Sequence, residues 1–283
     1  MSAARKAELI LVLITLIWGT TFVLVKTSLQ YSSTFLFLAL RFFLAALVLR
    51  IWFYQDLKNI SPATWIAGII IGLFLSAGNF FQTAGLKITT ASKSAFFTST
   101  VVVYVPMISV FLAKEKLRLS SIISVMIVTV GLFLLTSPQG QGFNLGDFLT
   151  IFCAMLFAFQ LVFVQVFSQK FEVRQLVYIQ LLTNFILSIP LIFIFDQVYL
   201  DFNWKFAGFL LYLAAIATGL VFFLQMRFQK DTTATKAAII YCLEPIFASG
   251  IACLTVGESF TTIGLIGAAV VIGGILISEL AHF

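Results

Sequence analysis

The sequence predicts an all-α membrane protein with ten transmembrane helices, arranged as two inverted five-helix repeats with both termini cytoplasmic. Three observations support this: an apolar composition, ten apolar runs of spanning length, and a motif that recurs 143 residues later. Of the 283 residues, 61% are hydrophobic and 10% are charged, and the mean hydropathy is +1.10. Soluble domains carry about 25% charged residues, so lipid rather than water must contact most of this chain's outside.

Each of the ten runs is long enough to cross a bilayer, which takes about 20 residues of α-helix. The runs cover residues 8–25, 33–54, 64–82, 93–112, 119–136, 146–167, 176–195, 206–226, 236–255 and 260–280. They are continuous rather than alternating, which favours helices over barrel strands. Arg5 and Lys6 precede the first run as in a signal peptide, but no small-residue cleavage site follows, so we expect an uncleaved helix.

The basic residues indicate the orientation, because cytoplasmic loops are enriched in lysine and arginine. With a cytoplasmic N-terminus, twelve basic residues lie inside, four lie outside and Arg41 lies within a span. The net charge of +6 is therefore a topology signal, and no nucleic-acid partner is expected. We expect a multi-pass protein of the plasma membrane, or of the inner membrane in a bacterium.

The two halves of the chain repeat each other. Residues 87–95 read KITTASKSA and residues 230–238 read KDTTATKAA. The same offset of 143 pairs Glu115 with Glu258, Gly131 with Gly274, and Arg41 with Asn184. We therefore expect two domains, residues 1–140 and 141–283. Five spans per copy is an odd number, so the second copy must be inverted, an arrangement typical of secondary transporters.

Several segments resemble the EamA-type family of the drug/metabolite transporter superfamily. They are WGTTFV at 18–23, ALRF at 39–42, TTASKSAF at 89–96, Val105-Pro106, LEPIF at 243–247 and Gly257-Glu258. Ala158-Phe159-Gln160 stands where Trp-Gly would recur in the second half, so the repeat is degenerate there. The resemblance covers essentially the whole chain. It implies a transporter of small metabolites, often an exporter of amino acids, that works by alternating access around a central cavity.

Arg41 and Glu244 are the clearest charges inside spans, where a charge costs at least roughly 2.5 kcal/mol. Counted from opposite membrane edges, each lies about 12 Å deep in a core of about 30 Å, so their heights differ by about 6 Å. We expect both to face the cavity and to pair in one state. In another state Glu244 would take up a proton, because burial disfavours a charged carboxylate and a nearby cation favours it.

Purely structural roles stay open for both charges. Glu244 could tie its helix to a neighbour's backbone, and Arg41 could bend outward to loop carbonyls. Further candidates for the cavity wall are buried amides, hydroxyls and aromatics, which need partners that a hydrated cavity supplies. They are Trp18, Asn79, Gln82, Tyr104, Gln160, Asn184 and Tyr241. Interhelical packing explains any one of them equally well.

No cofactor or metal is expected. Cys153, Cys242 and Cys253 lack metal-like spacing, and the single His282 is the penultimate residue. No phosphate-binding glycine loop is present in the sequence, so ATP is not the expected drive, and nothing indicates an enzyme. The expected partners are a small-molecule substrate, membrane lipid and protons, with the oligomeric state left open. The alternative function is a lipid or lipid-linked-sugar flippase on the same scaffold, for which a laterally open groove is expected.

Overall fold

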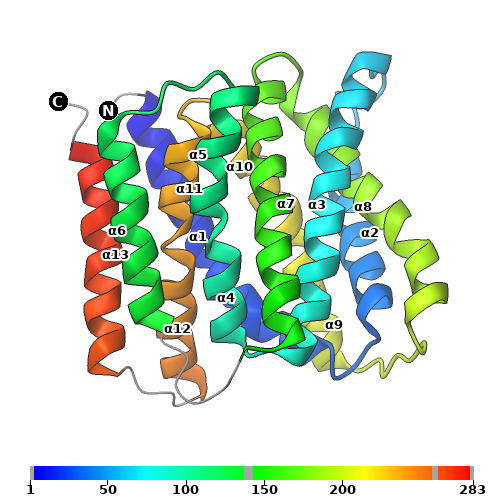
Figure 1. Cartoon of the computed structure of the whole chain (residues 1–283). Coiled ribbons are helices and arrows are strands. Elements are labelled where there is room, and N and C mark those ends of the chain that lie inside the picture. Colours follow the sequence, from blue (N-terminus) through cyan, green and yellow to red (C-terminus); the bar gives the residue numbers. More distant parts are fainter. Residues whose placement is uncertain (1–2, 137–142, 257–260, 281–283) are drawn as a thin grey trace.

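A computed structural model describes residues 3–136, 143–256 and 261–280, and its regular elements are helices (Figure 1). They are α1 (Ala3–Ser28), α2 (Thr34–Trp52), α3 (Pro62–Ile88), α4 (Ala91–Ser99), α5 (Val101–Leu112), α6 (Leu119–Thr136), α7 (Leu145–Ser168), α8 (Val173–Phe195), α9 (Trp204–Leu211), the π-helix η1 (Tyr212–Leu220), α10 (Val221–Gln229), α11 (Ala234–Tyr241), α12 (Glu244–Val256) and α13 (Thr262–Leu280).

These helices form ten spans within the described ranges, because α4–α5, α9–η1–α10 and α11–α12 each continue through one crossing. Eight spans are long and apolar enough to cross a membrane, and α6 and α13 contain shorter apolar stretches, Leu119–Leu135 and Thr262–Ser278. The predicted all-helical, ten-span fold is therefore confirmed.

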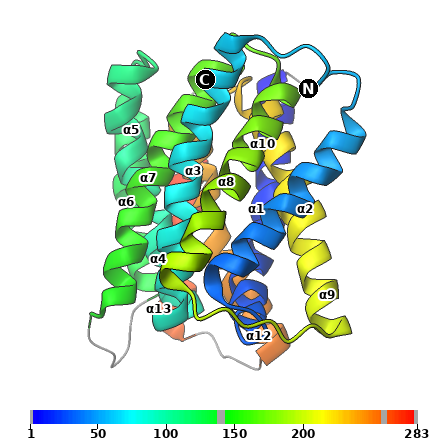
Figure 2. The same cartoon turned by 90° about the vertical axis from the view of Figure 1, so that its right-hand side faces the viewer.

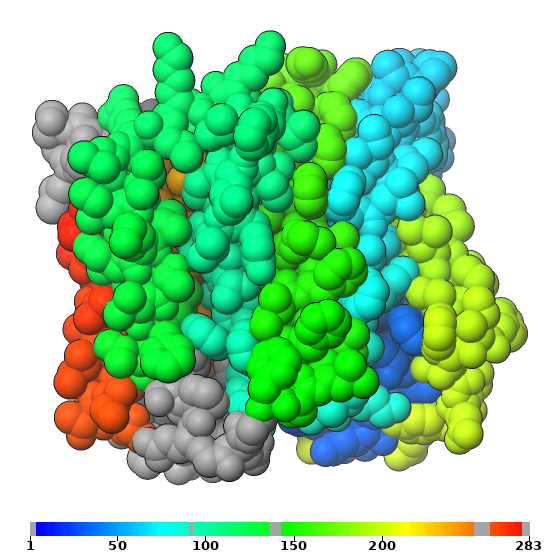
Figure 3. All heavy atoms as spheres, in the orientation of Figure 1, coloured from blue at the N-terminus to red at the C-terminus, as the bar shows by residue number. Residues whose placement is uncertain are grey.

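The outer surface is apolar, as lipid contact requires. Figure 3 shows one face, on which α6, α4–α5, α7 and α3 lie side by side. Phe111, Phe133 and Phe148 come from three of these spans and are 81%, 56% and 57% exposed. An apolar surface this continuous is not stable in water and indicates membrane burial.

The two halves are inverted copies. In Figure 1, α1 begins and α13 ends at the upper side, whereas α7 begins at the lower side. An offset of 143 residues carries α2 onto α8, α4 onto α11 and α5 onto α12 within a few residues. Contacts repeat too: a Cβ added to Gly131 would lie 2.7 Å from Val271, and one added to Gly274 would lie 2.7 Å from Val128. Val128 and Val271 are themselves 143 apart, so an approximate two-fold axis relates the halves.

Two spans expected to be continuous helices are interrupted, and the interruptions are equivalent. The span predicted at 93–112 breaks at Thr100, and the one predicted at 236–255 breaks after Tyr241 and resumes at Glu244. Pro245 explains the second break, because proline lacks the N–H that would bond four residues back but is tolerated in a first helical turn. In the first break, the Thr100 hydroxyl donates to the Phe97 carbonyl at 2.6 Å.

The two breaks meet near the axis. The Cys242 thiol lies 3.9 Å from the carbonyl oxygen of Ser99, and these residues are repeat mates, 143 positions apart. Residues related by a two-fold axis touch only close to that axis. The broken helices of both halves therefore converge at the centre of the molecule.

Helices α2 and α8 also pack against each other and are tied at both ends (Figure 2). At the lower end the Asp196 carboxylate accepts the N–H groups of Phe35 and Leu36 at 2.7 and 3.1 Å. At the upper end Arg174 pairs with Asp56 at 2.6 Å. The halves are thus joined outside the broken helices as well as between them.

Candidate functional site

A cavity lies between the halves, where the broken helices meet. It holds about 910 Å³ of space free of atoms, including its opening. Among the described residues, seven of the ten spans supply its wall. The lining residues are Trp18, Thr21, Phe22, Val25, Arg41, Leu75, Asn79, Gln82, Thr83, Leu86, Thr98, Ser99, Val101, Phe157, Gln160, Leu161, Phe222, Gln225, Tyr241 and Glu244.

The cavity follows the internal symmetry. Five pairs of lining residues are repeat mates at the offset of 143: Gln82 and Gln225, Thr98 and Tyr241, Val101 and Glu244, Trp18 and Leu161, and Asn79 and Phe222. Because both members of each pair face the same space, the cavity lies on the approximate two-fold axis. Inverted-repeat transporters place their substrate sites in this position.

The cavity extends toward one side of the molecule. Its lining runs down α1 as far as Val25 and down α3 as far as Leu86, into the last turns of both helices. Those turns lie on the side away from the start of α1. On the other side, Leu11, Ile14 and Ala238 are buried in one apolar cluster. Val25 and Leu86, at the lower end of the lining, are likewise buried in an apolar cluster with Leu29 and Phe206.

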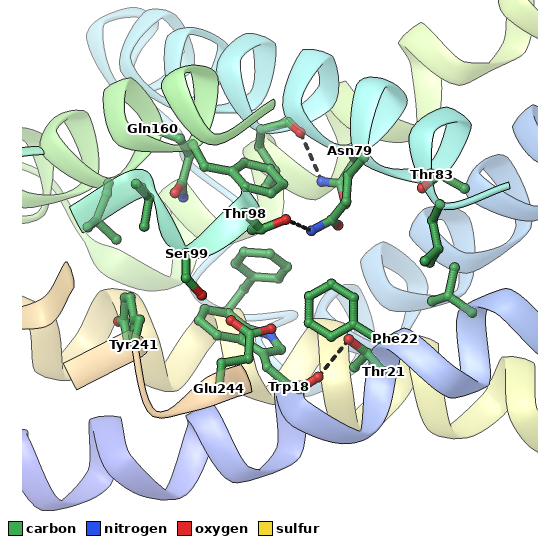
Figure 4. Close-up of a pocket in the computed structure, with 18 of the residues that line it drawn as sticks. Trp18, Thr21, Phe22, Asn79, Thr83, Thr98, Ser99, Gln160, Tyr241 and Glu244 are labelled. Carbon is green, nitrogen blue, oxygen red and sulfur yellow. Dashed lines mark hydrogen bonds between the residues drawn. The ribbon is translucent and has the colours of Figure 1, made fainter. Parts of the chain in front are cut away.

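Glu244 is the first residue of α12, directly after the break. Figure 4 shows its carboxylate pointing into the cavity, near Trp18 and Ser99. Within the described part of the chain, the structure records no hydrogen bond or ion pair for this carboxylate. The tie to a neighbouring backbone that the sequence left open is therefore not seen there.

Arg41 is 7% exposed and also lines the cavity. Its Nε donates to the Thr218 hydroxyl at 2.8 Å, and its guanidinium lies 5.6 Å from the ring centre of Phe42. The bond is to a side chain of the other half and not to loop carbonyls. Arg41 and Glu244 are not within ion-pair distance, so the predicted pair is not formed in this state.

The π-helix contributes to the site through two neighbouring residues. The Ala217 carbonyl accepts from the Trp18 indole N–H at 3.2 Å, next to the Thr218 hydroxyl that holds Arg41. A π-helix shifts the backbone hydrogen bonds by one residue relative to an α-helix and is frequent at functional sites. The equivalent part of α3 is regular α-helix, so this feature distinguishes the second half from the first.

The remaining polar groups of the wall are of two kinds. Asn79 donates to the Leu75 carbonyl at 2.8 Å, and Gln82 donates to Thr98 at 3.1 Å (Figure 4). In contrast, three groups are buried without a hydrogen-bond partner: Gln160 Nε2, Gln225 Oε1 and Tyr241 Oη. Buried polar groups are rarely left unpaired, so water or a ligand in the cavity is their expected partner.

Two predicted candidates do not line this cavity. Tyr104 packs against the apolar cluster that contains Leu11, Ile14 and Ala238. Asn184 is fully buried, and neither its amide nitrogen nor its oxygen has a partner. Both are polar residues in a span, but the direction in which they face is set by helix packing, which the sequence does not reveal.

Other wall residues were not among the predicted candidates. Gln225 is the repeat mate of Gln82, and Thr98 is the repeat mate of Tyr241. Applying the offset of 143 to the predicted residues would have found both. Ser99 and Thr21 carried no comparable signal.

The described residues contain no group of three or more His, Cys, Asp or Glu that could hold a metal ion. Glu258, His282 and the loop at 137–142 lie outside the described residues, as does the side chain of Cys253. The site is therefore defined by hydrogen-bonding groups, aromatic rings and two charges.

Comparisons with known proteins agree with this architecture. The model of the EamA-like transporter family matches residues 5–137 and again residues 144–280. An uncharacterized transporter of Archaeoglobus fulgidus is 33% identical over 97% of this chain and 86% of its own length. A Salmonella typhimurium protein named "Probable amino-acid metabolite efflux pump" is 26% identical over 97% of this chain and 95% of its own.

A solved crystal structure superposes with a TM-score of 0.81 at 18% identity, covering 98% of this chain and 96% of the other. At that identity the likeness supports the fold alone. The family match covers both halves of the chain. The protein is therefore a multi-pass membrane transporter and not an enzyme, and it belongs to the EamA-like transporter family.

Proposed function

We propose that this transporter exports small metabolites such as amino acids by alternating access around the central cavity. The observation that carries the proposal is a cavity on the approximate two-fold axis, lined by residues of both halves, that contains two charged side chains. If the two inverted halves exchange conformations, the cavity is exposed first to one side of the membrane and then to the other. The substrate then crosses without the protein leaving the membrane.

Two observations support an amino-acid-like substrate. The wall combines amides, two charges and several aromatic rings, which suits a molecule with a polar end and an apolar end. The Salmonella typhimurium relative is named as a probable amino-acid metabolite efflux pump. A lipid or lipid-linked sugar would need a groove open toward the bilayer, whereas seven spans surround this cavity.

Proton exchange at Glu244 is the proposed coupling. Its carboxylate stands in the cavity without a protein partner among the described residues, so it is free to hold either a proton or a cationic group of the substrate. Because one carboxylate cannot fully hold both at once, binding of one favours release of the other. This competition would couple outward movement of substrate to inward movement of protons.

Counterflow in liposomes tests the proposal. Purified protein is reconstituted with an excess of one unlabelled amino acid inside, and uptake of labelled amino acids and nucleosides is followed. Accumulation of one class, competed by its unlabelled members, is the expected result. No accumulation of any soluble metabolite by folded protein would contradict the proposal, and lipid-linked substrates would be examined next.

A further inference from the structure

We infer that the cavity is bipolar: Glu244 binds the ammonium group and Arg41 binds the carboxylate group of one zwitterionic substrate. The inference rests on the proposed function, since it takes the cavity to be the substrate site. It goes further by assigning a chemical group of the substrate to each end of the cavity.

The Glu244 end is built from groups that accept hydrogen bonds. Tyr241 Oη and Gln225 Oε1 line the same cavity as the Glu244 carboxylate, and each can accept a hydrogen bond. The Trp18 ring lies 5.3 Å from the Tyr241 ring, and both can contact a cation through their π faces. These features favour an ammonium group.

At the other end of the cavity, the Arg41 guanidinium group offers hydrogen-bond donors. Thr218 holds Nε and thereby orients the guanidinium group. No hydrogen bond from its two terminal nitrogens is recorded within the described part of the chain. A guanidinium group with free N–H groups binds a carboxylate through two parallel hydrogen bonds.

Neither charge is required by the scaffold. The repeat mate of Glu244 is Val101, which lines the same cavity, and the repeat mate of Arg41 is Asn184. The equivalent helices therefore fold with an uncharged residue at each position. Two opposite charges that stay apart inside one buried cavity lose the attraction that would offset their removal from water. A ligand that carries both opposite charges restores that attraction at both ends.

Three ligands that share a phenyl ring test the assignment: phenylalanine, phenethylamine, which lacks the carboxylate, and 3-phenylpropionate, which lacks the ammonium group. Their affinities for purified protein are measured by isothermal titration calorimetry. In the wild type, phenylalanine is expected to bind about tenfold or more tightly than either single-charge ligand.

Neutralising each charge should affect different ligands. Glu244→Gln is expected to weaken phenylalanine and phenethylamine by about tenfold and to change 3-phenylpropionate by less than about threefold. Arg41→Gln is expected to weaken phenylalanine and 3-phenylpropionate instead. Asp231→Asn and Arg227→Gln remove equivalent charges from an exposed pair outside the cavity and serve as controls. The wild-type order of affinities tests the inference even if a variant does not fold.

The inference is overturned if the wild type binds the three ligands equally, or if each variant weakens all three alike. It is also overturned if the wild type binds none of them yet accumulates another soluble metabolite in counterflow, in which case the proposed function stands. If no soluble metabolite accumulates in counterflow, the proposed function fails and the inference fails with it.

Discussion

The two halves of this transporter share a scaffold and differ in the chemistry they bring to the cavity. Thr90 and Thr233 cap α4 and α11 in the same way, each accepting the backbone N–H three residues later at 3.2 Å. Helix breaks and close glycine contacts repeat as well. The two charged residues of the cavity, Arg41 and Glu244, do not repeat, and neither does the π-helix. The fold is therefore symmetric, and under the proposed mechanism the asymmetric residues are the ones that recognise the substrate.

The largest expected effect comes from two related ion pairs at opposite ends of the molecule. Lys93 pairs with Asp147 at 3.1 Å, and its repeat mate Lys236 pairs with Glu8 at 2.8 Å. The side chains of the first pair are 8% and 1% exposed, against 13% and 12% in the second. Removing one partner of a buried pair costs about 3–5 kcal/mol, and the cost falls as solvent reaches the pair.

Asp147→Asn is therefore expected to lower the free energy of unfolding by about 3 kcal/mol, and Glu8→Gln by clearly less. The Asp147 carboxylate also accepts hydrogen bonds from the Thr89 hydroxyl and the Asn144 N–H, so the substitution weakens these bonds as well as the ion pair. Thermal unfolding of the two variants in detergent compares them. Equal losses would mean that the two ends are energetically symmetric, contrary to the burial difference.

The next effect concerns the contact between α6 and α13. A Cβ added to Gly267 would lie 2.2 Å from the backbone nitrogen of Leu135, so Gly267→Ala must push the helices apart. We expect a loss of about 1–3 kcal/mol. Gly273→Ala, on the same helix with nothing within 4 Å of the added Cβ, is the matched control and should be neutral or slightly stabilising. Similar melting temperatures for the two variants would contradict the observed packing.

A third prediction compares the effects on transport of substituting Arg41 and its repeat mate Asn184. Arg41→Gln is expected to reduce counterflow by about tenfold or more, because a charge-assisted hydrogen bond to the substrate is lost. Asn184→Leu removes an unpartnered buried amide outside the cavity, so transport should persist and stability should hold or rise. Loss of transport in folded Asn184→Leu would show that both mates act on the substrate.

The smallest effect is expected at the π-helix. Thr218→Val keeps the size of the side chain but removes the hydroxyl that orients Arg41. The affinity for carboxylate-bearing substrates should fall by about fivefold, the equivalent of about 1 kcal/mol. Calorimetry with phenylalanine measures it, with phenethylamine as the ligand that should be unaffected. An equal change for both ligands would place the effect on the cavity's shape instead.

Much of the fold was predictable, because the lengths of the apolar runs and the 143-residue repeat can both be read directly from the sequence. The span predicted at 119–136 coincides with α6, and the one at 146–167 differs from α7 by one residue at each end. The break at Thr100 and the π-helix at Tyr212–Leu220 were not predicted, because an apolar run does not specify which backbone carbonyl each N–H reaches. Those irregularities depend on contacts made after the helices pack.

The residues of the candidate site also divide into those that the sequence predicts and those that depend on helix packing. Arg41 and Glu244 were visible as charges in apolar surroundings, and both face the cavity. Gln225 required the repeat as well, since its own span gave no reason to prefer it. Tyr104 and Asn184 have equally suitable chemistry but do not line the cavity, because the rotation of each helix is set by the helices packed against it.

The most direct test of the account is counterflow by Glu244→Gln at several pH values, with wild type and Tyr104→Phe, a change outside the cavity, measured alongside. Wild type and Tyr104→Phe are expected to transport alike, with the same dependence on pH. Folded Glu244→Gln should transport about tenfold more slowly and without that dependence. If Glu244→Gln keeps both the wild-type rate and the wild-type pH dependence, Glu244 neither binds the substrate nor exchanges protons.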